Sequence, residues 1–366
     1  MEEARVMIVN AGSSSLKLSV LDGQGQLAAS RNLEGRPQDH PPAALAAAMT
    51  ALGPVEAVGH RVVHGGPDFI QATVIDPVVM AGLERLSGLD PLHLPGAMAG
   101  IHAAQAAFPN LPQVACFDTA FHADLPPAAA TYALPQSWRK RWGLRRYGFH
   151  GLSYAYATRR AAELMGTSAD QLQLVICHLG AGASAAAVSR GHSVDTTMGF
   201  TPLEGLVMAT RSGTVDPGLL IWLEREQGLS PKEIGDALEQ ESGLLGLAGT
   251  ADMKGVVEAA GSMPDAALAL EVYIHRLRQA IVSMTSSLGG LHALVFTGGV
   301  GEGSSAVREL AVSGLGFLGL SLDRESNVHD VGDRHLESRG SSVAILVLAA
   351  REDLQIAFEV RQLLTA

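Results

Sequence analysis

The chain has 366 residues, well beyond the ~150 expected of one domain, and 47% of them are hydrophobic while 17% are charged. This composition predicts two packed domains with a large core and excludes a disordered chain. The 26 Lys and Arg against 37 Asp and Glu give a formal net charge of −11. That charge argues against duplex nucleic acid or an anionic membrane as the main partner, and an anionic substrate would need a local basic pocket.

The two cysteines, Cys116 and Cys177, stand singly in apolar runs without Cys-x-x-Cys spacing. Neither a disulfide framework nor a thiolate metal site is indicated, which fits a reducing compartment. The longest uncharged apolar stretch, residues 343–350, is far shorter than the ~20 residues that a membrane span requires. We therefore expect a soluble, cytoplasmic protein.

The first elements in the chain are strands joined by tight turns. Residues 5–10 predict a buried strand, residues 11–15 a turn of small residues, and residues 16–22 a second strand that leads through another turn to a third. The same pattern begins again near residue 174. An offset of 168 residues places Gly12 on Gly180 and Val20 on Val188, which indicates an internal duplication.

Each copy places a glycine-rich turn after its first strand. Such a turn presents backbone N–H groups and small side chains, and it suits close approach to phosphate oxygens. Two copies facing each other would enclose a polyphosphate. Two ordinary hairpins of α/β domains are the alternative at this point, and the shared offset favours duplication.

Helical patterns alternate with the strands and several begin at proline. A late strand at residues 291–297 runs into glycines at 298–301, a junction of the kind where open α/β sheets bind ligands. The alternation predicts a mixed α/β fold. The expected helices are 42–52, 95–108, 150–165, 217–227, 264–288 and 352–365.

Charged residues also stand beside glycines and strand ends. Arg61 lies in His-Arg-Val-Val-His-Gly-Gly, Asp118 ends an apolar strand, His150 precedes a helix and Arg211 lies on a loop. Two arginines and an imidazole could neutralise a transferring phosphoryl group. Asp118 taken alone is more often a cap or turn residue, and the two histidines that flank Arg61 are better explained as structural than as zinc ligands.

Six segments, in chain order, resemble the acetate kinase family, and together they cover nearly the whole chain. They are Asn-Ala-Gly-Ser-Ser-Ser-Leu-Lys at 10–17, His-Arg-Val-Val-His-Gly-Gly at 60–66, Phe-Asp-Thr-Ala-Phe-His at 117–122, Arg-Tyr-Gly-Phe-His-Gly at 146–151, Met-Gly-Phe-Thr-Pro-Leu-Glu-Gly at 198–205 with Thr-Arg-Ser-Gly at 210–213, and Phe-Thr-Gly-Gly-Val-Gly-Glu at 296–302.

The resemblance implies a fold of two duplicated actin-like ATPase domains, which are ribonuclease H-like, with a nucleotide and substrate cleft between them. The first domain would comprise residues 1–119 and 352–366, and the second residues 120–351. Homodimers are usual in the family. The implied reaction is the magnesium-assisted, reversible phosphorylation of acetate or another short-chain carboxylate by ATP.

The resemblance also implies residue roles. Arg61 and Arg211 would hold the carboxylate and the transferring phosphoryl group, His150 would stabilise the transition state, and Asp118 would organise the site. A small carboxylic acid has a pKa of ~4 and is ionised at neutral pH, so Asp118 is not needed as a general base. The residues implied to position magnesium, or manganese in its place, through its waters are Asn10 and Glu352.

Two further sets follow from the resemblance. The pocket for the acyl methyl group would be lined by Val63, Leu92, Phe149 and Pro202. The ATP or ADP side would use Ser13, Ser15, Lys17, His178, Gly180, Gly182, Asp252, Gly298, Gly299 and Gly301.

The sequence departs from the family pattern at several of these segments. Most changes on the nucleotide side remove side-chain hydrogen bonds, each worth roughly 0.5 to 1.5 kcal/mol, so weaker nucleotide binding or a different phosphoryl donor is an open alternative. A nucleotide-binding regulatory protein without turnover is another, and acetate is not distinguished from propionate. The departures are Leu94, Leu152, Tyr154, Ala181, Lys254, Gly303 and Arg351.

Two other patterns resemble known binding motifs, but we do not assign a binding function to either. Gly314, Gly316 and Gly319 match the dinucleotide-binding glycine spacing, but they follow a helical stretch instead of a strand. The tryptophans and cations of residues 138–146 suggest a solvated helix or a subunit contact rather than a single-strand nucleic-acid site.

Overall fold

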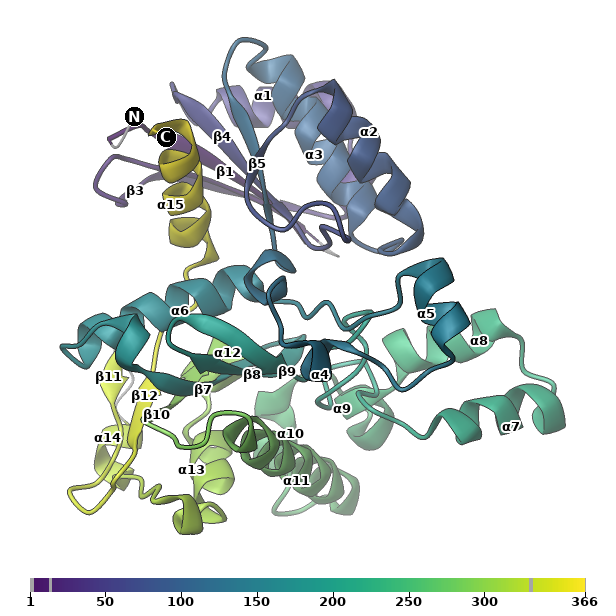
Figure 1. Cartoon of the computed structure of the whole chain (residues 1–366), viewed down its shortest axis with the longest axis vertical. Helices are drawn as coiled ribbons and strands as arrows, with labels where there is room; N and C mark the ends of the chain where they lie inside the picture. The colour runs from purple at the N-terminus through teal and green to yellow at the C-terminus, as the bar shows by residue number, and fades with distance from the viewer. Residues whose placement is uncertain (1–2, 13–14, 329–331, 366) are drawn as a thin grey trace. The chain divides into compact units, whose positions relative to one another are not determined.

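The computed structural model describes residues 3–12, 15–328 and 332–365. The chain forms two compact units (Figure 1). The first contains Met1–Ala123, Phe149–Tyr156 and Arg351–Ala366, and the second contains Asp124–Gly148 and Ala157–Ala350. No helix among the described residues is both long and apolar enough to cross a membrane.

The first unit is built on a six-stranded sheet in the order β3-β2-β1-β4-β6-β5. Strands β1, β4 and β6 are parallel, while β2, β3 and β5 run antiparallel to their neighbours. The strands are β1 (Val6–Ala11), β2 (Ser15–Leu21), β3 (Leu27–Glu34), β4 (Ala57–Val62), β5 (Thr73–Val74) and β6 (Gln113–Phe117).

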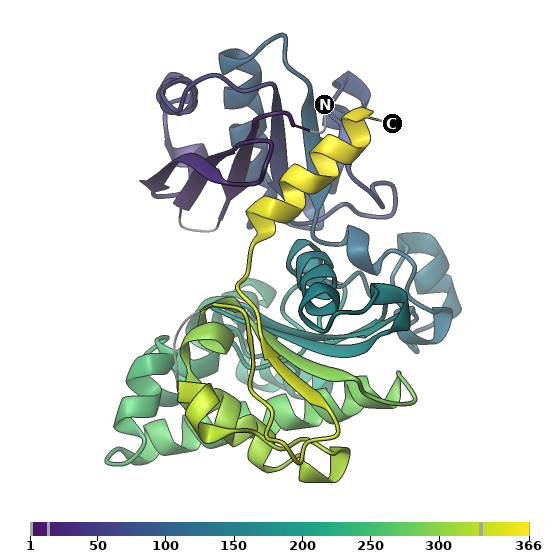
Figure 2. The same cartoon turned by 90° about the vertical axis from the view of Figure 1, so that its left-hand side faces the viewer.

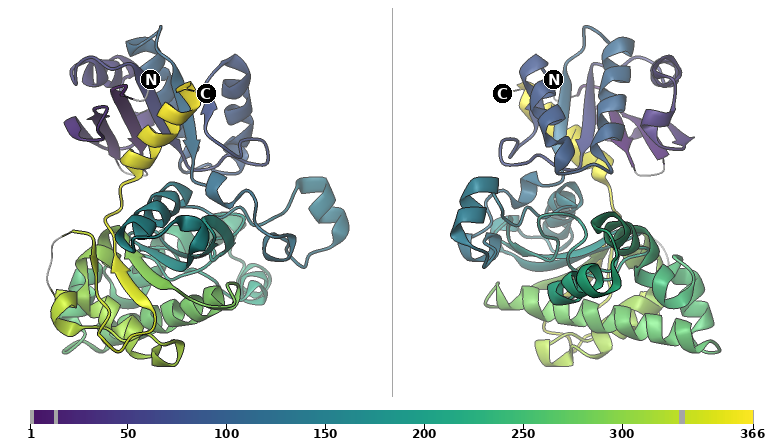
Figure 3. Two further views of the ribbon diagram at one scale, coloured as in Figure 1. Left: turned by 60° about the vertical axis from the view of Figure 1, so that its left-hand side comes forward. Right: turned by 90° about the vertical axis from the view of Figure 1, so that its right-hand side faces the viewer.

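Helices cover both faces of this sheet because the side chains of β1 alternate. Met7 and Val9 pack in one core with α1 (Pro42–Thr50) and α3 (Leu94–Ala107). Val6 and Ile8 pack in another core with the C-terminal helix α15 (Glu352–Thr365). Figures 2 and 3 show α15 lying across the sheet on the side opposite to α1 and α3. Helix α2 (Pro77–Arg85) also belongs to this unit.

The second unit repeats the plan with the sheet order β11-β12-β10-β7-β8-β9. Its strands are β7 (Gln173–Leu179), β8 (Ala183–Ser189), β9 (His192–Thr196), β10 (Ala293–Thr297), β11 (Arg334–His335) and β12 (Ala344–Val347). Its helices are α4 (Pro127–Ala130), α5 (Gln136–Trp142), α7 (Pro217–Gln227), α8 (Pro231–Asp236), α9 (Gly243–Ala248), α10 (Met253–Ala259), α11 (Pro264–Ser286), α12 (Gly298–Gly303), α13 (Ser305–Ser313) and α14 (Arg324–Val328), with most of α6 (Gly151–Leu164).

The two sheets confirm the predicted α/β fold and its duplication. Strands β7, β10 and β12 are parallel, and β8, β9 and β11 are antiparallel to their neighbours, as in the first sheet. The order β9-β8-β7-β10-β12-β11 therefore corresponds strand by strand to β3-β2-β1-β4-β6-β5. All six predicted helices are present within two residues of their expected starts and ends.

The predicted equivalence of Val20 and Val188 is wrong by one residue. Val20 pairs with Met7, whereas Val188 pairs with Leu174 and so lies one step further along its hairpin. The first hairpin closes at the pair Ala11↔Leu16 and the second at Leu179↔Ala183. The second turn is one residue shorter, so the 168-residue offset holds in the first strand and changes to 167 in the second.

The expected domain boundaries after residues 119 and 351 stay a prediction. In the structure, residues 149–156 pack with the first unit because Leu152 lies in the core beneath α15. The backbone N–H of Gly151 also donates to the Asp118 carbonyl at 2.9 Å.

Candidate active site

The parallel strands of the first unit end at the same edge of their sheet and bring polar residues together there. Asn10 lies near the end of β1 and is the register partner of Arg61 in β4. Asp118 follows β6 directly, and its N–H donates to the carbonyl of Val62 at 3.1 Å. Glu352 is the first residue of α15. The carboxyl ends of parallel strands are where α/β sheets usually bind ligands.

These four residues form one hydrogen-bonded network. The Arg61 guanidinium donates from Nη2 and Nε to Asp118 Oδ2, at 2.7 and 3.1 Å, and from Nη1 to Asn10 Oδ1 at 3.3 Å. Asn10 Nδ2 donates to Glu352 Oε2 at 3.3 Å, and the same oxygen lies 3.7 Å from Arg61 Nε. Residues 342 positions apart are thus joined around one cation.

Burial and charge oppose each other in this network. Asp118 is fully buried, and this burial raises its pKa to about 6 even though the Arg61 charge favours the ionised form. Burial disfavours the charge of Arg61, but Asp118 and Glu352 outweigh it and raise the Arg61 pKa. Asp118 Oδ1 makes no hydrogen bond to any described residue, so one buried carboxylate oxygen remains available.

His150 is held next to Asp118 in a conformation that side chains rarely adopt. Its φ is +60°, in the left-handed region. The next residue, Gly151, begins α6 and is fixed to the Asp118 carbonyl, and a Cβ at Gly151 would overlap that oxygen. A strained residue over-determined by its neighbours is typical of functional sites.

Arg211 lies in the second unit on the loop after the Gly-Phe-Thr-Pro-Leu-Glu-Gly segment. Its Nη1 donates to the Pro202 carbonyl at 3.4 Å, and its own carbonyl accepts from Met208 N at 3.1 Å. Gly213, with φ of +70°, packs where a Cβ would overlap the carbonyl of Leu206. The loop backbone is therefore fixed on both sides of Arg211.

Three segments of the second unit that were predicted to bind nucleotide line one hollow of about 500 Å³. Gly180 comes from the turn after β7, Asp252 from the start of α10, and Gly299 from α12. Asp252 caps α10 by accepting from the backbone N–H groups of Lys254 and Gly255, at 3.1 and 3.3 Å. The structure thus gathers residues 180, 252 and 299 around the same space.

The other predicted residues lie as follows. Gly298 has a φ of +79° where a Cβ would lie 2.8 Å from the Leu179 carbonyl, and His178 is the register partner of Thr297. Phe149 is buried with its ring edge-on to His64, and Leu92 is 42% exposed. Ser13 lies outside the described residues. Those remaining are Ser15 and Lys17 in β2, Gly182 before β8, Gly301 in α12, and Val63 after β4.

Comparison with known proteins decides the family. The family model for the acetokinase family matches residues 44–358 of this chain. The chain belongs to the acetokinase family. It is 44% identical to the acetate kinase of Leifsonia xyli subsp. xyli, with 99% of each chain covered, and 49% identical to that of Microcystis aeruginosa over 84% of this chain and 77% of the relative.

Solved structures agree with the acetokinase assignment. The Porphyromonas gingivalis acetate kinase superposes with a TM-score of 0.91 at 33% identity and covers 98% of this chain and 99% of its own. A propionate kinase from Francisella tularensis superposes with a TM-score of 0.89 at 35% identity, covering 97% and 98%. The actin-like ATPase fold of these acetokinases is therefore the fold of both units of this chain.

Three of the seven departures from the acetokinase pattern, Ala181, Lys254 and Gly303, line the hollow. Ala181 and Gly303 line it without any polar side chain. Lys254 lies at its rim with a side chain 81% exposed and Nζ 4.0 Å from Glu258. Arg351 is held by Asp353 through two contacts of 3.0 and 3.1 Å.

Tyr132, Arg146 and Glu204 form a second polar network in the second unit, and no role was predicted for them from the sequence. Arg146 Nη2 lies 2.8 Å from Glu204 Oε1, and Tyr132 Oη donates to Glu204 Oε2 at 2.6 Å. Both Arg146 and Glu204 lie in the family-like segments given above, Arg146 two residues before Gly148 and Glu204 directly before Gly205. A charged residue close to a glycine was therefore the signal that could have identified them. Tyr132 has no such signal, because only the fold brings it to the loop.

The histidines beside Arg61 are used structurally. His60 is buried with its Nε2 2.9 Å from Gln113 Oε1, and His64 Nδ1 accepts from Gly66 N at 2.9 Å.

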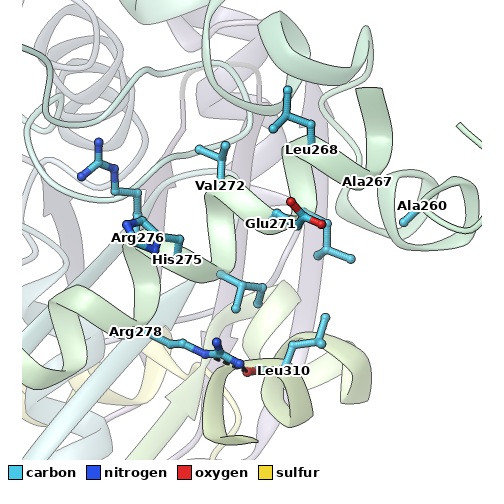
Figure 4. A pocket seen from close by; sticks show the side chains of 11 residues that line it. Ala260, Ala267, Leu268, Glu271, Val272, His275, Arg276, Arg278 and Leu310 are labelled. Carbon is cyan, nitrogen blue, oxygen red and sulfur yellow. Dashed lines mark hydrogen bonds between the residues drawn. The ribbon is translucent and has the colours of Figure 1, made fainter. Parts of the chain in front are cut away.

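Volume alone does not identify the site. A hollow of about 730 Å³ on α11 and α13 is lined by Leu268, Glu271, His275, Arg278 and Leu310 (Figure 4). Arg278 Nε donates to the Leu310 carbonyl at 3.1 Å, so this cation binds a backbone carbonyl in the last turn of α13. No residue predicted to act in the reaction lines this hollow.

Proposed function

We propose that this protein transfers the terminal phosphoryl group of ATP to acetate or another short-chain carboxylate, such as propionate, and catalyses the reverse reaction. The observation that carries the proposal is the network of Arg61, Asp118, Asn10 and Glu352, which fixes a cation beside two acids at the ligand-binding edge of a sheet. Membership of the acetokinase family supports the reaction type.

The proposed step needs no proton transfer. A carboxylate oxygen attacks the γ-phosphorus in line, the bond from that phosphorus to the oxygen bridging the β-phosphate breaks, and ADP leaves with the electron pair. The acid is already ionised at neutral pH because its pKa is ~4. Catalysis therefore depends on alignment and on neutralising two anions that repel each other.

Each side chain takes a role that suits its chemistry. Arg61 is rigidly held by Asp118 and offers a permanent charge to the substrate carboxylate or the transferring phosphoryl group. Arg211 supplies a second such charge, and His150 stabilises the charge that develops in the transition state. Asp118 orients Arg61. The acyl methyl group would contact Val63, Leu92, Phe149 and Pro202.

The residues fit a magnesium ion that is bound mainly through water and phosphate. Asp118 Oδ1 is buried without a hydrogen bond from the described residues, and Glu352 and Asn10 add oxygens on the same network. No group of three or more His, Cys, Asp or Glu among the described residues could hold a metal alone. Magnesium commonly binds through one or two carboxylates with waters and substrate phosphates, and when bound it neutralises phosphate charge.

The hollow that contains Gly180, Asp252 and Gly299 would hold the adenosine and phosphates of ATP. Ser13, Ser15, Lys17, His178, Gly182, Gly298 and Gly301 would complete the nucleotide contacts. The turn at residues 298–301, which would contact the adenosine, keeps the glycines of the family pattern, and this favours ATP over pyrophosphate as donor.

A second candidate is a nucleotide-binding protein without turnover, which is favoured by the loss of polar side chains at Ala181 and Gly303. One assay separates the two. The protein is incubated with magnesium and ATP, GTP or pyrophosphate, together with acetate, propionate or butyrate, and acyl phosphate is trapped with hydroxylamine. Acyl phosphate at ordinary enzyme rates supports the kinase. ATP binding without acyl phosphate from any of the three acids supports the second candidate.

Two further expectations accompany the proposal. The homodimer can be tested by light scattering during size-exclusion chromatography. A reducing, cytoplasmic location is consistent with Cys116 and Cys177 being buried and unpaired with each other.

A further inference from the structure

The loop of residues 199–205 is closed on itself by side chains from outside it. Tyr132 Oη accepts from Phe200 N at 2.9 Å and donates to Glu204 Oε2 at 2.6 Å, so one hydroxyl joins the two ends of the loop. Arg146 donates from Nη1 to the carbonyls of Thr197 and Met198, at 3.1 and 2.9 Å, and from Nη2 to Glu204 at 2.8 Å.

The closure requires glycine at position 199. A Cβ there would overlap both Glu204 Oε2 and Tyr132 Oη, so the carboxylate and hydroxyl lie directly against the backbone. The Gly199 carbonyl in turn accepts from Tyr147 N at 3.0 Å. Arg146 also lies over the Tyr132 ring, 5.5 Å from its centroid. Every group in the arrangement therefore has a defined partner.

The closed loop carries a group that the proposed reaction uses. Pro202 lies between the two ends, and its carbonyl accepts from Arg211 Nη1 at 3.4 Å. At the end of the loop, Gly205 N donates to Thr214 Oγ1 at 3.1 Å and Thr214 N donates to the Gly205 carbonyl at 3.0 Å. The segment that bears Arg211 is thus tied to the loop at Arg211 itself and at Thr214.

We propose that Tyr132, acting with Glu204 and Arg146, is a positioning residue that sets the place of Pro202 and of the Arg211 guanidinium for the acyl substrate. The inference deepens the proposed function and rests on it. Tyr132 does not touch substrate in this proposal. Its hydroxyl stiffens the loop, and a displacement of the reacting groups by about 1 Å is enough to cost catalysis heavily.

The chemistry of the hydroxyl suits this task. Burial and the hydrogen bond to Glu204 raise the pKa of Tyr132 well above its ordinary value. The phenol therefore keeps its proton and donates to the carboxylate throughout the neutral range. A hydrogen bond to a charged group is stronger than one between neutral groups.

The test compares Tyr132→Phe with Tyr273→Phe. Tyr132→Phe keeps the ring beneath Arg146 and removes only the hydroxyl. Tyr273 is a buried tyrosine of α11 whose hydroxyl has no hydrogen-bond partner among the described residues, so its variant removes the same atom without breaking a bond. Kinetics are measured with acetate, propionate and ATP varied in turn.

For Tyr132→Phe we expect kcat/KM for acetate to fall about tenfold, with the KM for ATP changed less than about twofold. Propionate should lose less than acetate, since a looser Pro202 tolerates the extra methylene. Hydrogen exchange at the Phe200 amide should accelerate. Tyr273→Phe should match the wild type in each of these measurements.

A carboxylate pair tests the same bond from its other end. Glu204→Gln keeps an oxygen that can accept from Tyr132 and should retain more activity than Glu204→Ala. Equal loss in the two Glu204 variants overturns the proposal, as does unchanged acetate kinetics in Tyr132→Phe. A parallel rise in the KM values for acetate and ATP would show a general structural defect and also overturn it. A wild type that makes no acyl phosphate removes the proposed function and this inference together.

Discussion

The carboxylate of Asp118 receives two hydrogen bonds on one oxygen, Oδ2, from the guanidinium of Arg61, and leaves its second oxygen without a hydrogen bond to any described residue. The aspartate therefore orients the Arg61 guanidinium with Oδ2, while its Oδ1 can still accept a hydrogen bond or bind a metal ion. Because Asp118 follows β6 directly and Arg61 is the last but one residue of β4, the parallel pairing of these strands sets the geometry of the pair.

Asp118→Asn should lower kcat by about 10²- to 10³-fold, because an amide cannot hold Arg61 with full charge or offer a carboxylate oxygen to magnesium. ATP affinity, measured by calorimetry without carboxylate, should change much less. The exposed Asp170 provides the control, and Asp170→Asn should have wild-type kcat. Retained turnover in Asp118→Asn would exclude the aspartate from the reaction.

The activity should have an acid limb close to pH 6. Burial raises the pKa of Asp118 to about 6, so acidification through that pH protonates the carboxylate and weakens its hold on Arg61. The same shift cannot unfold the protein, since a carboxyl pKa raised on folding makes the folded state gain relative stability as pH falls from 6 towards 3.8. The kcat profile is measured between pH 5 and 8, and no decline down to pH 5 would contradict the assignment.

Arg211→Ala should lower kcat more than it weakens ATP binding, because its charge acts mainly on the transition state. We expect a loss of about 10²-fold or more in kcat. Arg211→Lys restores the charge without the planar fork and should recover only part of the loss. If Arg211→Ala keeps the wild-type kcat, the residue has no part in the reaction.

Ala181→Asn should improve nucleotide use. Ala181 lines the hollow with a methyl group, and an amide there can regain one hydrogen bond, which corresponds to about a two- to tenfold lower KM for ATP. The KM for acetate serves as the internal control and should be unchanged. A higher KM for ATP would mean that the asparagine blocks the hollow.

Two buried histidines should make stability depend on pH. Burial lowers the pKa values of His60 and His122 from 6.5 to about 4. Between these two pH values the unfolded chain therefore binds more protons than the folded chain. Stability should therefore fall as pH drops from 6.5 towards 4, by about 3 kcal/mol for each histidine. Asp118 acts in the opposite direction over part of this range.

Urea unfolding at pH 7 and pH 5 measures the effect. His60→Gln and His122→Gln should each show a smaller difference between the two pH values than the wild type. The exposed His192 is the control, and His192→Gln should keep the wild-type difference. If the wild type and the three variants lose the same stability between pH 7 and pH 5, the lowered pKa values of His60 and His122 are contradicted.

Local sequence patterns predicted several strands, six of the helices, the duplication and the charged residues of the candidate site. Alternating or continuous apolar residues predicted β1, β7 and β10, and proline starts predicted α7 and α11, because these patterns reflect the local period of the backbone. Motif residues such as Arg61 and Arg211 could be identified from the sequence because the permanent charge of arginine is a property of the residue type and does not depend on the fold.

Which side chains meet became clear from the packing of distant segments. Asn10 reaches Glu352 because α15 returns to the first sheet, and Tyr132 reaches Glu204 because a loop from another part of the chain closes on Gly199. The one-residue difference between the two hairpins was likewise settled by strand register. Contacts between distant segments depend on how whole elements pack, and a local pattern carries no information about that packing.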